Sequence, residues 1–209
     1  TLAPSGIPLV GVNQGRLGFL TDLSLDSMQR SLSEMLQGKL MTEQRMLLNG
    51  GVMRNGEKIF CAQAFNEVVI HRSNVSSMVE FEVRIDGDYV YTQRADGLIV
   101  STPTGSTAYA LSAGGPIVHP SLNVITLVPV CPHTLSNRPI VVSGESKIEI
   151  LMHRTEDVRV RYDSHTHFDL HLGDTLVVAR HPEPVRLLHP AGHSYYHTLR
   201  EKLLWNKSL

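Results

Sequence analysis

The chain has 209 residues, 42% of them hydrophobic, and its 19 basic and 20 acidic side chains give a formal net charge of −1. This length and apolar content suffice for one well-buried domain and part of a second. The charge balance excludes a dominant basic face, so neither nucleic acid nor a membrane is expected as a partner. No apolar run approaches the ~18 residues that span a bilayer, and no secretory leader opens the chain. Cys61 and Cys131 lie far apart in apolar contexts, which favours a reduced, cytoplasmic setting.

The first 38 residues predict the end of an α/β unit. Residues 7–12 are typical of a short buried strand, and a turn-rich stretch follows it. Apolar residues then recur at helical spacing over residues 24–37, with Ser24 placed to cap this helix and Gly38 to end it. A strand at the start has no partner of its own, so either it joins a sheet built later or an upstream region is missing, and the second option is favoured.

From about residue 39 the pattern changes to short strands separated by turns. Asn55-Gly56 and Asp86-Gly87 predict tight hairpins, and residues 78–86 alternate between apolar and charged side chains. Strands are expected over residues 43–54, 57–70, 78–86, 88–93, 97–101, 123–130, 138–142, 146–152, 157–162, 167–172 and 175–181. Such a run indicates an antiparallel sandwich. A short helix at residues 107–113 interrupts the strands, and a terminal helix is expected near residues 194–205.

The stretch at residues 96–116 is the most informative. A strand leads into a loop rich in hydroxyl side chains, then a short helix that Ser106 or Thr107 is placed to cap, then Gly-Gly-Pro. Free N–H groups at such a helix start favour an anion. No Lys follows the glycine, so this is not a Walker A loop, and there is no Rossmann fingerprint. A capped helix with a tight turn and a ligand-binding loop both fit.

Asn66 and Glu67 interrupt an apolar strand pattern with two polar side chains. An amide can read the edge of a base, and a carboxylate can accept hydrogen bonds from ribose hydroxyls. The alternative is a polar pair that is satisfied at a strand end. Because neighbours on a regular strand point to opposite faces, both reach one ligand only where the strand bends or ends.

The 11 histidines and the first glycines give weaker signals. His165 and His167 share one face of an expected strand, and His171 keeps the same parity, which suits a metal. No Asp, Glu or Cys completes a ligand set, so a polar outer face is favoured over a metal site. In the same way, Gly11, Gly15 and Gly18 favour an ordinary turn over a phosphate loop.

Four blocks in order, with a fifth feature near the C-terminus, resemble the bacterial NAD kinases of the Gram-negative type. The blocks are residues 11–22, 66–69, 96–116 and 132–139, and Ser194-Tyr195-Tyr196 before a helix is similar as well. The resemblance covers essentially the whole chain. It implies an α+β fold: a remnant of an N-terminal α/β domain (residues 1–38), an antiparallel β-sandwich domain that binds NAD (39–188), and a C-terminal helical segment that returns to the α/β domain (189–209).

The resemblance also implies a reaction, the ATP-dependent phosphorylation of the 2′-hydroxyl of the adenosine ribose of NAD to give NADP. Mg²⁺ accompanies ATP in such a transfer. In the family the base is the Asp of a Gly-Gly-Asp-Gly loop upstream of the Gly11 block. These 209 residues do not contain that loop, so no catalytic residue is expected in this chain. The family implies a homodimer or homotetramer.

The residues that the family uses for NAD carry over to matching positions. Asn66 and Glu67 are expected to hold adenosine groups, Asp96 to contact the dinucleotide, and Tyr109 to stack on a ring. Arg94 resembles the residue associated with a preference for NAD over NADH. The implied set is completed by Ser101, Thr107, Ala108, Ala110, Leu111, Ser112 and His165, the last at a position where the family has Gln or His.

Three other functions stay open at this point. A non-catalytic nucleotide-binding module fits a chain without the base, and a lipid kinase fits a related fold. A His-dependent metallohydrolase fits the histidines. Residues 96–116 together with Asn66-Glu67 fit the dinucleotide branch better than the lipid branch.

Overall fold

The structure, a computed structural model, describes residues 5–14, 18–72, 78–134, 136–154 and 157–205. Residues 15–17 of the first motif block and Leu135 of the last lie outside the described residues. The chain divides into two units, one joining Thr1–Arg45 with Glu183–Leu209 and the other formed by Met46–Pro182. The sequence-based borders after residues 38 and 188 stay a prediction.

In the part of the first unit that the structure describes, there are two small sheets and two helices. Its elements are β1 (Leu9–Val10), β2 (Val12–Asn13), β3 (Leu23–Ser24), α1 (Met28–Leu36), β4 (Leu40–Arg45), β17 (Val185–Pro190) and α3 (Tyr195–Leu203). Strand β17 lies between β1, which is parallel to it, and β4, which is antiparallel. The strand expected over residues 7–12 is therefore present as two short pieces, whereas β17 was not predicted.

Both helices of this unit begin close to a serine. Helix α1 begins at Met28 and not at Ser24, because Leu23–Ser24 pairs with β2 instead. It ends as predicted at Gly38, whose φ of 90° suits a residue without a side chain. Helix α3 has Ser194 as its N-cap, and the Ser194 hydroxyl accepts a hydrogen bond from the His197 N–H at 3.3 Å.

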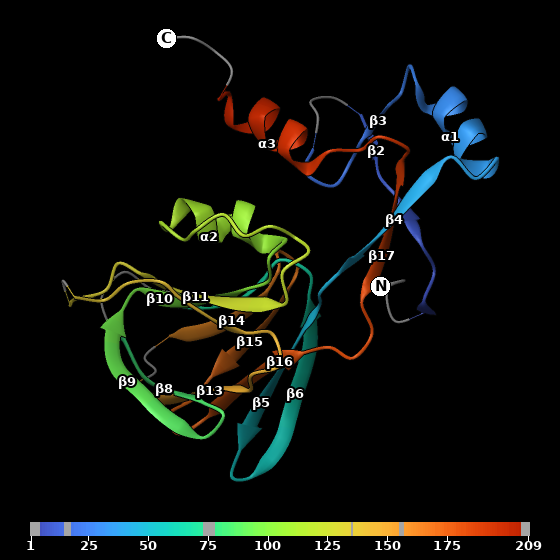
Figure 1. Cartoon of the computed structure of the whole chain (residues 1–209). Helices are drawn as coiled ribbons and strands as arrows, with labels where there is room; N and C mark the ends of the chain where they lie inside the picture. The colour runs from blue at the N-terminus through green and yellow to red at the C-terminus, as the bar shows by residue number, and fades with distance from the viewer. Residues whose placement is uncertain (1–4, 15–17, 73–77, 135, 155–156, 206–209) are drawn as a thin grey trace. The chain divides into compact units, whose positions relative to one another are not determined.

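The second unit confirms the antiparallel sandwich (Figure 1). One six-stranded sheet has the order β12 (Ile140–Ser143), β11 (Val124–Val130), β10 (Gly97–Ser101), β7 (Glu67–Arg72), β14 (Val158–Tyr162) and β15 (Thr166–Leu170). The other has the order β6 (Glu57–Ala64), β5 (Leu48–Arg54), β16 (Thr175–Arg180), β13 (Ile148–Arg154), β8 (Val79–Ile85) and β9 (Asp88–Ala95).

The core of this unit lies between the two sheets. Alternate residues of each strand point inward, so that Ile70 and Leu98 from one sheet share a cluster with Phe81 and Ile150 from the other. Tyr162 is also fully buried, and it packs against Gly50 so closely that a Cβ there would lie 2.4 Å from the Tyr162 ring.

The turns explain where the strands begin and end. Asn55 and Asp86 adopt φ values of 53° and 54°, each followed by a glycine at positive φ, which confirms both hairpins. Two expected strands are in fact four. Residues 43–54 divide into β4 and β5, and residues 57–70 divide into β6 and β7, with each half in a different sheet.

A short helical segment covers the outer face of the β7–β10–β11 sheet. It consists of η2 (Gly105–Thr107) and α2 (Tyr109–Ser112), where a helix over residues 107–113 was expected. Ala110 of α2 packs on Val69, Ile99 and Val128.

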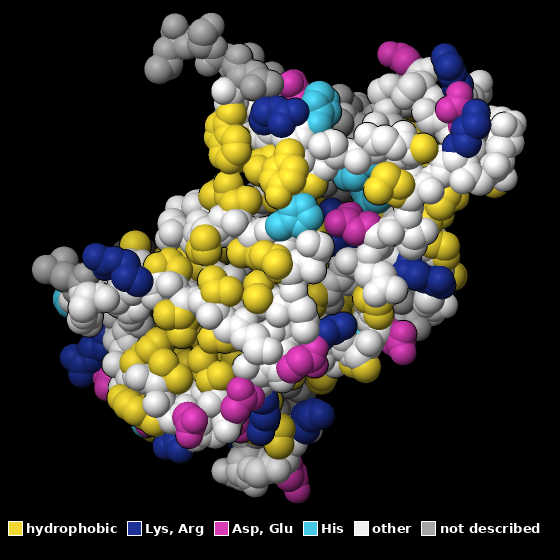
Figure 2. All heavy atoms as spheres, in the orientation of Figure 1, with side chains coloured by type: hydrophobic (Ala, Val, Ile, Leu, Met, Phe, Trp, Pro, Cys, Tyr) yellow, Lys and Arg dark blue, Asp and Glu magenta, His cyan; other side chains and the backbone are white. Residues whose placement is uncertain are grey.

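Among the described residues, none of the helices has the length and apolar character needed to cross a bilayer. Along the lower rim of this unit in Figure 2, acidic and basic side chains are interspersed.

We predict that Asp174→Asn destabilises the sandwich by about 3 kcal/mol, because it breaks a buried charge pair. The Asp174 side chain is 0% exposed and accepts two hydrogen bonds from Arg54, both at 2.8 Å. Burial alone raises the pKa of Asp174, but the bonds from Arg54 and the His171 N–H outweigh burial and lower it. Denaturant unfolding measures the loss.

The matched control is Asp169→Asn, which removes a carboxylate that is 65% exposed from its pair with Arg159. It should change the free energy of unfolding by less than about 1 kcal/mol. Equal effects of the two substitutions would contradict the assignment of the Arg54–Asp174 pair to the core.

Candidate functional site

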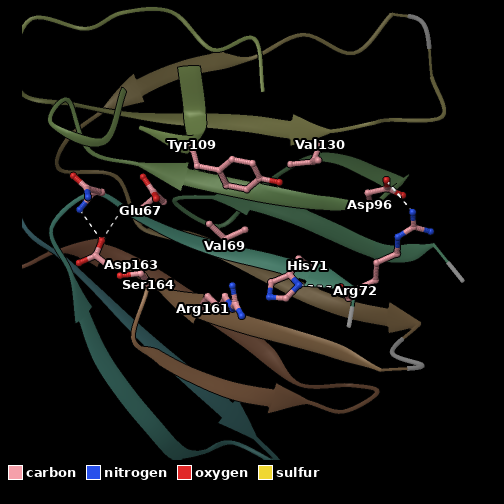
Figure 3. Close-up of a pocket in the computed structure, with 11 residues that line it drawn as sticks. Glu67, Val69, His71, Arg72, Asp96, Tyr109, Val130, Arg161, Asp163 and Ser164 are labelled. Carbon is pink, nitrogen blue, oxygen red and sulfur yellow. Dashed lines mark hydrogen bonds and ion pairs between the residues drawn. The ribbon is translucent and has the colours of Figure 1, made fainter. Parts of the chain in front are cut away.

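A cavity of about 500 Å³ opens on the outer face of the sheet that contains β7, β10 and β14. This volume lies in the range of small-ligand sites. Figure 3 shows the lining as a row, with Glu67, Asp163 and Ser164 at one end and Asp96 with Arg72 at the other. The lining residues are Asn66, Glu67, Val69, His71, Arg72, Asp96, Tyr109, Val130, Arg161, Asp163 and Ser164.

Asp163 organises the first end of the cavity. Its carboxylate accepts three backbone N–H groups, from Phe65 and Asn66 at 2.8 Å and from Glu67 at 3.2 Å. In return, the Asp163 N–H donates to the Glu67 carbonyl at 3.0 Å. A φ of 50° at Asp163 turns the chain tightly between β14 and β15 and brings the carboxylate to these amides. The carboxylate thus holds the break between β6 and β7.

This break is what lets Asn66 and Glu67 share one cavity. Asn66 lies outside both strands, and Glu67 is the first residue of β7, so the alternation of a regular strand does not separate them. The hydroxyl-rich loop packs on the same bend. The Thr102 N–H donates to the Asn66 carbonyl at 2.9 Å, and a Cβ on Gly105 would lie 2.1 Å from that oxygen. Only glycine allows this approach.

Glu67 has a buried carboxyl oxygen that lacks a hydrogen-bond partner among the described residues. Its side chain is 8% exposed, and its Oε2 atom is buried without a hydrogen bond. Burial, and to a smaller degree the charge of Asp163, raise the pKa of Glu67 to about 7. Near neutral pH this group can therefore donate or accept a hydrogen bond, as a ligand requires.

At the other end, Asp96 lies between β9 and β10 and forms an ion pair with Arg72 at 3.1 Å. Between the two ends, Tyr109 of α2 presents a ring that is 44% exposed, beside the apolar Val69 and Val130. The cavity therefore has polar ends, and its middle combines this apolar, aromatic surface with the polar side chains of His71 and Arg161.

Four of the sequence-predicted residues meet in this cavity, namely Asn66, Glu67, Asp96 and Tyr109. Arg94 does not, because it is 64% exposed and forms an ion pair with Glu80 at 2.7 Å, beside a separate hollow. Ser101 is fully buried and donates to the Thr102 carbonyl. His165 is exposed next to Ser164. The remaining predicted residues, which lie along the η2–α2 segment without lining the cavity, are Thr107, Ala108, Ala110, Leu111 and Ser112.

The expected capping of the short helix is wrong. The Ser106 hydroxyl donates to the Pro103 carbonyl at 2.6 Å, and the Thr107 hydroxyl donates to the Thr104 carbonyl at 3.2 Å. Neither side chain caps η2 or α2. In this loop the hydroxyls instead donate to backbone carbonyl groups three residues earlier.

Sequence reasoning missed Asp163 as an organising residue, and it missed His71 and Arg161 as lining residues. Asp163 stands in a turn next to His165, which was singled out, but its three bonds reach residues about a hundred positions away. His71 and Arg161 lie on neighbouring strands β7 and β14, which are distant in sequence. Their only sequence signal was strand parity.

A second polar cluster lies in the first unit. Asp22, His189 and His193 bring their ligand atoms within 4.8 Å of one another. The two imidazole rings are stacked at 4.1 Å and 16°, so a single ion cannot lie in the plane of both. Burial lowers the pKa of His189, but hydrogen bonds to Asp22 and Glu43 outweigh it and raise the pKa to about 9. His189 is thus an imidazolium that bridges two carboxylates.

The three histidines that share strand parity in the sequence lie in the second unit. His165, His167 and His171 are exposed on and beside β15.

We predict that Asp163→Asn costs about 1.5–3 kcal/mol of stability, the value of hydrogen bonds to a charged acceptor, because an amide accepts at only one of its two atoms. Urea unfolding measures this loss. Asp86→Asn is the matched control: Asp86 has a similar positive φ, but among the described residues its carboxylate accepts a single N–H, that of Lys147. A smaller loss is expected there, and an equal loss would contradict the organising role of Asp163.

We predict that Glu67 makes stability fall as pH rises. The unfolded carboxyl ionises near its ordinary pKa of 4.5, whereas the folded one keeps its proton up to about 7. Between these values the folded state binds more protons, so the free energy of unfolding decreases with pH. Glu67→Gln should be more stable than the unchanged chain above pH 7, by about 1–3 kcal/mol, and equal to it below pH 4.5. Urea titrations at pH 4.5, 6 and 8 test this, with the exposed Glu57→Gln as control. A pH-independent difference would refute it.

Comparison with known proteins identifies the family. The ATP-NAD kinase C-terminal domain family matches residues 65–189, which include all the cavity-lining residues. The NAD kinase of Nitrosomonas europaea is 58% identical over 205 residues, which cover 98% of this chain and 69% of that protein. The NAD kinase of Nitrosospira multiformis is 60% identical over 205 residues, which cover 98% of this chain and 70% of that protein.

Solved structures agree with these relatives. Yeast NADH kinase, in a complex with NADH, gives a TM-score of 0.89 at 28% identity, covering 97% of this chain and 60% of that one. An NAD kinase from Archaeoglobus fulgidus, in a complex with ATP, gives 0.77 at 28% identity, covering 93% of this chain and 74% of that one. The chain therefore belongs to the bacterial NAD kinases.

Proposed function

We propose that the cavity of the sandwich binds the NAD that these kinases phosphorylate on the 2′-hydroxyl of the adenosine ribose, with ATP as the donor. One observation carries the proposal. Four residues that the family resemblance assigns to NAD from two separate sequence blocks line a single cavity in the structure, namely Asn66, Glu67, Asp96 and Tyr109. The resemblance rests on sequence motifs alone, whereas the cavity depends on the order of the strands in the sheet, so the two observations are independent.

The chemistry of the lining suits a dinucleotide. At one end, the Asn66 amide and the Glu67 carboxyl offer donors and acceptors for a base edge and ribose hydroxyls. The exposed Tyr109 ring, which also lines the cavity, can stack on a planar heterocycle. At the other end, Asp96 provides a second set of acceptors. The complexes of related kinases with NADH and with ATP support both classes of ligand.

In this proposal the described residues bind and orient NAD and do not transfer protons. The 2′-oxygen attacks the γ-phosphorus of ATP, its proton leaves to a base, and ADP departs. Holding the dinucleotide at both ends fixes where this hydroxyl lies, which is the contribution of orientation to catalysis. No residue of this chain is assigned as the base.

The cavity does not supply the ligands of a Mg²⁺ ion. Asp163 is committed to three N–H groups, Asp96 is paired with Arg72, and Glu67 carries a raised pKa. A hard cation needs several free anionic oxygens. Mg²⁺ is therefore proposed only as the companion of the ATP phosphates, and no step is assigned to it.

Further parts of the proposal rest on the family. The enzyme is cytoplasmic and forms homodimers or homotetramers. Arg94 sets a preference for NAD over NADH. Its side chain is exposed beside Gln93 and His133, where it can contact another surface. The binding site also includes residues that do not line the cavity, namely Ser101, His165 and the segment from Thr107 to Ser112.

We predict that Asp96→Ala and Asn66→Ala each weaken NAD binding by about 1–3 kcal/mol, as expected for the loss of buried polar contacts. Calorimetric titration of the chain with NAD measures the change. Asp88→Ala, which removes an exposed carboxylate at the start of β9, is the control and should leave binding unaltered. Unchanged affinity in both site variants would remove the assignment of NAD to this cavity.

A further inference from the structure

The middle of the cavity holds a histidine nitrogen that nothing in the described structure satisfies. His71 Nδ1 lies 2.9 Å from the backbone carbonyl of Arg72, and because a carbonyl only accepts, Nδ1 must carry the hydrogen. The other nitrogen, Nε2, is buried and makes no hydrogen bond. The neutral ring therefore presents a bare lone pair at the cavity lining. Such an orphan atom indicates a missing partner.

An uncompensated cation lies beside it. Arg161 of β14 is the register partner of Val69 on β7, so it stands diagonally next to His71 on the same face of the sheet. Figure 3 shows Arg161 and His71 next to each other on this lining. Arg159 on the same strand is paired with Asp169, and Arg72 is paired with Asp96. Arg161, by contrast, is exposed and forms no ion pair with a carboxylate among the described residues.

The position of this pair identifies the chemistry of its ligand. His71 and Arg161 lie between the Asn66–Glu67 end and the Asp96 end of the row in Figure 3. A dinucleotide carries its two nucleosides at its ends and its negatively charged diphosphate in the middle. We infer that His71 and Arg161 form the subsite for the diphosphate bridge of the bound dinucleotide, and that His71 takes up a proton when the diphosphate binds. This inference rests on the proposed function.

The electrostatics support proton uptake. Burial lowers the pKa of His71, the bond to the Arg72 carbonyl raises it, and the cations Arg161, Arg159 and His167 lower it further. The charged groups around the ring also include Asp169, which is paired with Arg159, the Arg72–Asp96 pair and Glu67. A bound diphosphate brings negative charge next to Nε2 and therefore raises the pKa of His71. The protonated Nε2 then donates to a phosphoryl oxygen, beside the Arg161 guanidinium.

The first test is calorimetric titration of the chain with NAD and, separately, with adenosine, which lacks the diphosphate. Arg161→Gln should weaken NAD binding about 10- to 100-fold, the value of a charge-assisted hydrogen bond, and leave adenosine binding unaltered. Arg159→Gln is the matched control. It removes the same charge from the same strand face, at the position directly opposite His71 but outside the cavity lining, and should weaken NAD binding less than about threefold.

The second test counts protons. NAD is titrated at pH 7.5 in two buffers that differ in ionisation enthalpy. His71→Asn keeps a donor for the Arg72 carbonyl and deletes Nε2. The unchanged chain should take up more protons than this variant, by up to one per NAD. Glu67 is present in both proteins, so the difference between them reports His71.

Two results would overturn the inference while leaving the proposed function in place. The first is an equal loss of NAD affinity in Arg161→Gln and in Arg159→Gln. A loss of affinity in Arg161→Gln that is no greater for NAD than for adenosine would count in the same way. The other is proton uptake that His71→Asn does not change. If the unchanged chain binds neither NAD nor adenosine, the proposed function itself fails and the inference with it.

Discussion

The site depends on one carboxylate that binds backbone rather than ligand. Asp163 reaches from the turn after β14 to three consecutive amides at the break between β6 and β7. Without this acceptor, three N–H groups would be half-buried and unpaired, and each would cost about 1–3 kcal/mol. A continuous strand would satisfy them in its own ladder, but would also send Asn66 and Glu67 to opposite faces. The Asp163 carboxylate therefore takes the place of the strand partners of these amides and allows the chain to bend. The hydroxyl-rich loop packs on that bend at Gly105.

Once the scaffold has satisfied its own polar groups, the atoms that remain unsatisfied show where a ligand belongs. Thr102, Ser106 and Thr107 spend their hydroxyls on carbonyl groups, and Asp163 spends both of its oxygens on amides. Along the cavity, the exceptions among the described residues are the buried Glu67 Oε2 and His71 Nε2 atoms, and beside them the exposed Arg161 guanidinium forms no ion pair. Because buried polar groups rarely stay unpaired, these exceptions trace the outline of a molecule with hydroxyls at one end and negative charge further along.

Local sequence patterns predicted local structure well and non-local structure poorly. The alternation of Val79, Phe81 and Val83 placed β8 within a residue of its bounds, and Asn55-Gly56 fixed a hairpin through backbone conformation alone. The break between β4 and β5 was missed, because apolar Met46 and Leu47 carry no turn signal, and β17 was missed between two prolines. The motif residues of the site were found as motifs. Asp163, His71 and Arg161 were not, because only the pairing of β7 with β14 brings these distant segments together.

This separation of scaffold from ligand contacts has a consequence for specificity. The bonds that hold the bend are directed at main-chain atoms, so they do not constrain which side chains stand at the cavity. His71 and Arg161 point away from the main core, on the face opposite to Ile70 and Tyr162, and their replacement removes no core packing. The charge in the middle of the cavity can therefore change while the bend, the sheets and the nucleoside ends stay as they are. Affinity for the bridge of the ligand is in this way separable from stability of the fold, whereas at Asp163 the two are inseparable.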